Sequence, residues 1–82
     1  MYKPALYERV VLARDFVENN LQCGDVATLV DVVPHPSGGR DGLVLEVTNA
    51  LGDAIHVIIV TADDIEPLNA NEVFAVRPLA SR

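Results

Sequence analysis

The sequence predicts an all-β protein, a small five-stranded barrel that forms one domain. Short apolar runs with the two-residue alternation of β-strands recur along its 82 residues. Pro, Gly and Asn residues that favour turns separate these runs. Half of the residues are hydrophobic but only 5% are aromatic, so the core must be built from Val, Leu, Ile and Ala. A chain of this length supports a single hydrophobic core.

Five apolar runs account for the strands of the predicted barrel. They are residues 8–14, 25–33, 43–48, 54–61 and 65–68. The second run ends at Pro34, because proline cannot donate a hydrogen bond to a strand ladder. Between the first two runs, residues 15–24 form a long connecting loop that Leu21 is expected to anchor in the core.

The third and fourth runs form a predicted hairpin. Residues 49–53 make its turn, with Gly52 suited to a positive φ angle. The inward positions of the third run are Leu43, Leu45 and Val47. Both faces of residues 54–61 are mostly apolar, so we expect another surface to cover the outer one.

A capped helical turn is predicted between the fourth and fifth runs, over residues 61–66. Thr61 is a suitable N-cap, and Asp63 and Asp64 lie where the dipole of the turn favours negative charge. The alternative interpretation, in which Asp63 and Asp64 bind a cation, is not needed to explain them. This order of elements, a long first loop, a tight hairpin and a helical turn before the last strand, is that of a small SH3-like barrel.

The sequence continues past this barrel as a C-terminal extension. We expect the barrel to occupy about residues 6–68 and the extension residues 69–82 of the single domain. Residues 72–79 alternate again and predict an extra C-terminal strand. This strand can pack on its own barrel as a sixth strand, or it can add to the sheet of another chain.

Three segments of the chain resemble a known family. Residues 7–12, 23–32 and 56–68 are similar to the bacterial family catalogued as domain of unknown function 4926, a small SH3-like barrel, and the resemblance covers roughly residues 6–68. It implies the fold, supplies no catalytic residues and suggests an antitoxin-like or immunity-like role beside a partner protein. Ala27 stands where the family pattern has Gly, Cys23 where Lys is commoner, and residues 69–82 are an addition.

The charge of the chain is strongly acidic. Net charge is −6, and 11 acidic residues but only one base, Arg40, lie between Asp15 and Val76. Binding to nucleic acid requires Lys and Arg to neutralise phosphates, so this balance disfavours nucleic acid and anionic membranes. It favours a basic protein partner, although acidic residues also serve simply to solvate a small protein.

No catalytic, cofactor or metal site is predicted. His56 is expected to be a partly buried, hydrogen-bonded strand residue, and His35 a solvated loop residue. Cys23 is interpreted as a small hydrophobe at a loop end, in preference to a nucleophile with His56 as its base. Two His and one Cys are too few for a structural zinc site. A single Cys excludes an intramolecular disulfide. The chain has no apolar run of about 20 residues and no secretory signal, so we expect a cytoplasmic protein.

We therefore predict a non-enzymatic protein-interaction module with a basic protein partner, or a homodimer formed by strand addition. The alternative is an RNA- or ribosome-associated barrel of the KOW type, because residues 23–32 also resemble the KOW strand. Barrels of that type use basic loops, which this chain lacks. The candidate interaction surface combines the fourth strand with the C-terminal strand. Its residues are His56, Ile58, Val60, Val73, Phe74 and Val76.

Overall fold

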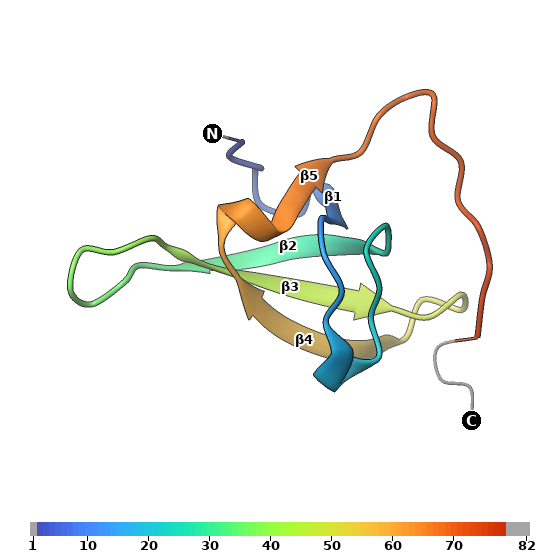
Figure 1. Ribbon diagram of the computed structural model, residues 1–82, viewed down its shortest axis with the longest axis horizontal. Coiled ribbons are helices and arrows are strands. Elements are labelled where there is room, and N and C mark those ends of the chain that lie inside the picture. The colour runs from blue at the N-terminus through green and yellow to red at the C-terminus, as the bar shows by residue number, and fades with distance from the viewer. Residues whose placement is uncertain (1, 79–82) are drawn as a thin grey trace.

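The computed structural model describes residues 2–78 as one twisted antiparallel sheet with two short 3₁₀ turns (Figure 1). The strands are β1 (Arg9–Leu12), β2 (Val26–Val33), β3 (Gly42–Thr48), β4 (Ala54–Val60) and β5 (Ile65–Pro67). The turns are η1 (Val17–Asn19) and η2 (Ala62–Asp64). The strand order is β4-β3-β2-β1-β5. The prediction of a five-stranded all-β fold with a helical turn before the fifth strand is confirmed.

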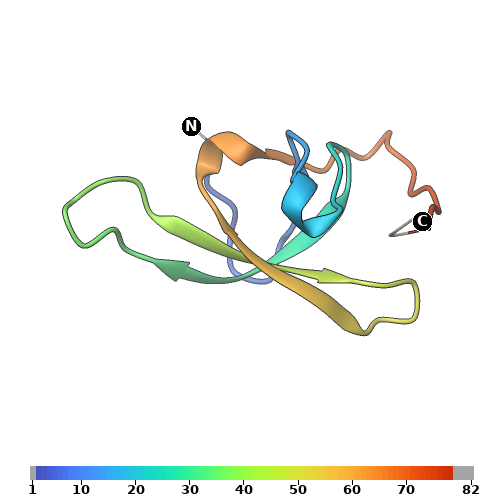
Figure 2. The same ribbon diagram turned by 60° about the horizontal axis from the view of Figure 1, so that its bottom comes forward.

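The sheet is curled but open, which corrects the predicted closed barrel (Figure 2). Its two borders are β4 and β5, and within residues 2–78 these borders do not pair with each other. β5 has only three residues, all opposite β1, and it ends at Pro67. Proline has no backbone N–H, so β5 offers few groups with which β4 could close the sheet.

The core lies on the concave side of this sheet. Leu21 of the first loop and the inward positions of β3 belong to it, as the sequence predicts. Its buried side chains are Val10, Leu12, Phe16, Leu21, Ala27, Leu29, Leu43, Leu45, Val47, Ile58, Val60 and Ile65. Burial of apolar side chains from all five strands is what holds the sheet in its curled shape.

A β-bulge near the start of β4 decides which side chains face the core. Thr48 lies opposite Ala54, but the preceding residue, Val47, lies opposite His56. Ile55 is therefore an extra residue on β4, and it reverses the faces of all the residues that follow it. From this point Val57 lies opposite Glu46 on the outer face.

The turn between β3 and β4 has the predicted position. The side-chain Oδ1 of Asn49 accepts the N–H groups of Leu51 and Asp53, each at 2.9 Å. Gly52 adopts a φ of 90°, which only glycine tolerates without strain. These contacts fix where β4 begins, next to the bulge.

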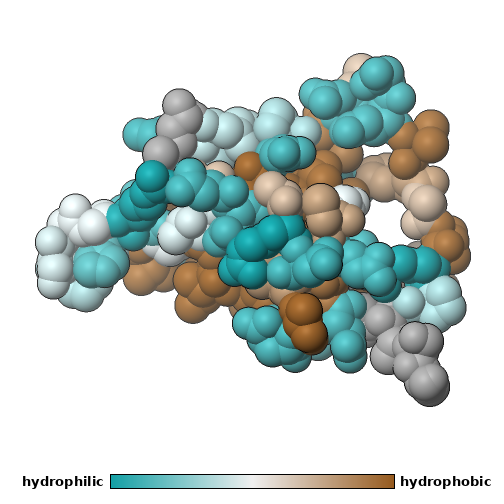
Figure 3. Space-filling model, viewed as in Figure 1, coloured by the Kyte–Doolittle hydropathy of each residue, from teal (hydrophilic) through white to brown (hydrophobic). Residues whose placement is uncertain are grey.

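The predicted C-terminal strand does not form over residues 72–78, and Leu79, its last residue, lies outside the described residues. The segment 69–78, called the tail below, stands away from the sheet and leaves an opening between them (Figure 3). The side chain of Arg77 donates a hydrogen bond to Oδ1 of Asp25 at 3.3 Å. The tail thus runs back towards the start of β2, and over residues 72–78 it pairs with neither border of the sheet.

Candidate functional site

The candidate functional site is the outer border of the sheet at β4. We define the β4 edge as the backbone of Ala54–Val60 together with the exposed side chains of Val57 and Ile59. These two side chains are 63% and 67% exposed, and within residues 2–78 the backbone beside them pairs only with β3. In Figure 3 hydrophobic atoms gather along the lower border of the sheet, over the end of β4.

The β4 residues of the predicted interaction surface lie on the inner face of the sheet, not on the outer face as predicted. Ile58 and Val60 are buried, at 7% and 4% exposure, and they pack in the core. His56 is partly buried opposite Val47 on the same inner side. The bulge at Ile55 causes this exchange, because an unbulged hairpin would have placed the other set of side chains inward.

The predicted tail residues are exposed, but the structure does not bring them to β4. Val73 and Val76 are 91% and 94% exposed. The guanidinium of Arg9, on β1, lies 5.7 Å from the centre of the Phe74 ring. Together with the Arg77–Asp25 contact, this places Phe74 and Arg77 beside β1 and the start of β2. The predicted surface is therefore two separate regions.

A shallow cavity of about 340 Å³ lies at the end of the β4 edge. Its apolar part comes from Val33, Pro34, Pro36 and Ile59. The two prolines end β2 because they cannot continue its ladder. The side chain of Ile59 thus belongs both to the β4 edge and to the lining of this cavity.

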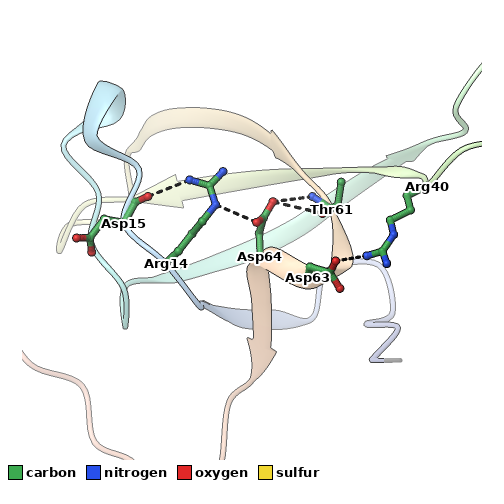
Figure 4. A network of polar contacts seen from close by, with 6 residues as sticks. All are labelled: Arg14, Asp15, Arg40, Thr61, Asp63 and Asp64. Atoms are coloured by element: carbon green, nitrogen blue, oxygen red, sulfur yellow. Dashed lines mark hydrogen bonds and ion pairs between the residues drawn. The ribbon is translucent and has the colours of Figure 1, made fainter.

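Two arginines bind the carboxylates of η2 beside this surface (Figure 4). Arg14 donates from Nε to Oδ1 of Asp64 at 2.9 Å, and Arg40 forms an ion pair with Asp63. The same Asp64 carboxylate accepts the N–H of Thr61 at 3.0 Å, and Asp64 donates its own N–H back to the Thr61 carbonyl. Thr61 occupies the N-cap position of η2, as predicted, and Asp63 and Asp64 have arginine partners.

These contacts change the titration of two groups. Burial raises the pKa of Asp64, but the hydrogen bonds from Thr61 and Arg14 outweigh it and hold that pKa below its ordinary value of 3.8. The hydrogen bond and charge of Asp63 raise the pKa of Arg40. Asp64 therefore stays ionised, which preserves its ion pair with Arg14.

The remaining polar residues of interest lie apart from one another. His35 is exposed, and its Nδ1 accepts the N–H of Ser37 at 3.0 Å. Cys23 is a free, exposed thiol, not a packed hydrophobe. Over residues 2–78, no group of three or more His, Cys, Asp or Glu side chains is placed to hold a metal ion. That part of the chain also contains no helix with the length and apolar character needed to cross a membrane.

Comparison of the chain with protein-family models, curated proteins and solved structures finds no match. The residues that sequence reasoning missed are Val57 and Ile59. Only their pairing with the outward positions of β3, Glu46 and Val44, could have identified them, and that pairing depends on the bulge.

Proposed function

We propose that this protein is a non-enzymatic protein-interaction module that binds its partner by strand addition at the β4 edge. One observation carries the proposal: a seven-residue strand forms the border of the sheet and exposes Val57 and Ile59 beside its unpaired backbone. In strand addition, the backbone hydrogen bonds supply affinity and alternate side chains supply specificity.

The charge of the chain supports a protein partner with a basic surface. The chain carries 12 acidic and 6 basic residues. Three of its arginines are already in ion pairs with carboxylates of the same chain. Because acidic residues outnumber basic ones and half of the basic residues are engaged internally, the surface field is acidic and attracts basic partners. An antitoxin-like or immunity-like binder of a basic protein fits this description.

The alternative function, an RNA-associated barrel, has weaker support. Binding to RNA needs free Lys and Arg side chains that can neutralise phosphates. Arg14, Arg40 and Arg77 are held by Asp64, Asp63 and Asp25, respectively.

The test is capture of the partner with three forms of the full chain as bait. The wild type and Val17→Lys should retain a stoichiometric protein from a lysate of the source organism, and Val57→Lys should lose it. Val17 is a matched control because it is 80% exposed but lies in η1, outside the β4 strand. Hydrogen exchange of the complex should show protection of the β4 amides. Equal capture by all three baits, with unprotected β4 amides, would refute binding at this edge.

A further inference from the structure

We propose that the β4 edge pairs antiparallel with the β4 edge of a second copy of this chain, around a two-fold axis at Ile58. This inference rests on the proposed strand addition at the β4 edge, and it places a second copy of the chain there in place of a basic protein partner. The paired segment would be residues 56–60, the regular part of β4 beyond the bulge at Ile55. The two open sheets would then form one continuous ten-stranded sheet.

The β4 edge lacks the features that normally prevent edge pairing. Proteins protect their exposed strands with charged residues, prolines or bulges, or by covering them with another segment. Residues 56–60 contain no Asp, Glu, Lys, Arg or Pro. The bulge at Ile55 precedes this segment and leaves it regular. An edge of this kind is suited to pair with another strand.

The charge distribution permits a second copy at the β4 edge, although it disfavours contact elsewhere on the surface. Two copies with a net charge of −6 each repel one another over most of their surfaces. Within residues 56–60 there is no charged residue on either copy, and so no like charges lie opposite each other across the paired strands. The neighbouring carboxylates are also partly neutralised, because Asp63 and Asp64 are paired with Arg40 and Arg14.

The register around Ile58 joins the exposed apolar side chains. Antiparallel pairing with this centre places Val57 of each copy opposite Ile59 of the other, twice in the interface. A two-fold axis perpendicular to the sheet keeps both side chains on the outer face. Both are more than half exposed in the single chain, so the pairing covers apolar surface that is otherwise in water. On the inner side, His56 would lie opposite Val60.

The tail is the other segment of the chain that could fill this edge, and its own contacts argue against it. Phe74 lies against Arg9, and Arg77 is bonded to Asp25. In the single chain these contacts hold Phe74 and Arg77 beside β1 and the start of β2. Pairing of β4 with β4 breaks no contact of the single chain.

The first test is the mass of the full chain in solution at micromolar concentrations. Light scattering should give twice the chain mass of 8.9 kDa. Val57→Lys and Ile59→Lys should each weaken the dimer by about tenfold or more, because each places charges in the paired edge. Val17→Lys, on exposed η1, should leave the dimer unchanged. Circular dichroism of each variant checks that it is folded.

A cross-linking experiment tests the register. Val57→Cys and Ile59→Cys are made separately in a Cys23→Ser background, then mixed and oxidised. Directly opposed residues are close enough for a disulfide, whereas diagonal neighbours are about 7–8 Å apart. We expect disulfides between the two different variants to exceed those within either variant by several fold.

Each outcome separates this inference from the proposed function. A strict monomer, or a dimer that Val57→Lys does not weaken, would overturn β4 self-pairing. A dimer that is lost with Ala75→Pro in the tail but kept with Val57→Lys would assign the interface to the tail. If the chain is monomeric but a captured partner protects the β4 amides, the self-pairing fails and the proposed function stands.

Discussion

Arg14 and Asp64 are 50 positions apart in the sequence, and Nε of Arg14 donates a hydrogen bond of 2.9 Å to Oδ1 of Asp64. The backbone reinforces this contact, because the N–H of Ala13 donates to the Asp64 carbonyl at 2.7 Å. The end of β1 is thereby joined to η2, the turn that leads from β4 into β5. This connection joins β1 to the turn between β4 and β5, next to the candidate site.

A double-mutant cycle on Arg14→Ala and Asp64→Ala should give a coupling energy of about 0.5–1 kcal/mol. The Arg14 side chain is 55% exposed, which limits the value through solvent screening. Urea unfolding of the four proteins measures it. The same cycle on the more exposed pair Arg40 and Asp63 should give a smaller coupling, and a larger one there would contradict this account.

The unfolding free energy should depend on pH through Asp64. Its pKa in the folded chain is lowered below the ordinary value of 3.8, so its stabilising effect is complete above that value and is lost as the pH falls through the folded pKa. We expect stability to decline below about pH 4, and to decline less steeply in Asp64→Asn, which cannot ionise. Urea titrations over a pH series provide the measurement. Parallel curves for the two proteins would show that Asp64 is not responsible.

Leu45→Ala should destabilise the fold by about 2–5 kcal/mol. Leu45 is fully buried in the centre of β3, and its truncation leaves a cavity in a core that is already small. A domain of this length has a total stability of about 4–12 kcal/mol, so the loss is a large part of the whole. The control is Leu51→Ala, 87% exposed in the hairpin turn, for which urea unfolding should change by no more than about 0.5 kcal/mol. Similar effects at both positions would refute the assignment of the core.

Tyr2→Phe should leave the protein as stable as before, or up to about 1 kcal/mol more stable. The Tyr2 hydroxyl is buried without a hydrogen-bond partner within residues 2–78. Burial, followed by the charge of Glu8, raises the pKa of this hydroxyl. Thermal and urea unfolding of Tyr2→Phe should be compared with Tyr7→Phe, whose ring is 72% exposed and which should show no change. A clear loss of stability in Tyr2→Phe would mean that the hydroxyl has a partner in solution.

The sequence pattern predicted β3 well because one face of that strand lies on the core and the other carries Val44 and Glu46. Alternation there has a single interpretation. In β4 both alternate sets are apolar, so the pattern does not identify the inner face. The extra residue at Ile55 then reversed the faces, and Val57 and Ile59 became the exposed pair.

The tail shows a different limit of sequence reasoning. Residues 72–78 have the alternation of a strand, but a strand forms only where another strand offers it hydrogen bonds. The contacts of Phe74 and Arg77 hold the tail beside β1 and the start of β2.

The Arg14–Asp64 contact was also not predicted, because no local sequence pattern relates two residues that only the folded chain brings together.

The unequal lengths of the two sheet borders limit how large an assembly can grow. Among the described residues, β4 offers seven positions, whereas β5 offers three and ends in a proline. A fibril needs two competent edges on every subunit, so that each added chain presents a new template for the next. Once the β4 edge of this chain is occupied, only the short proline-ended border is left, and edge-to-edge growth stops.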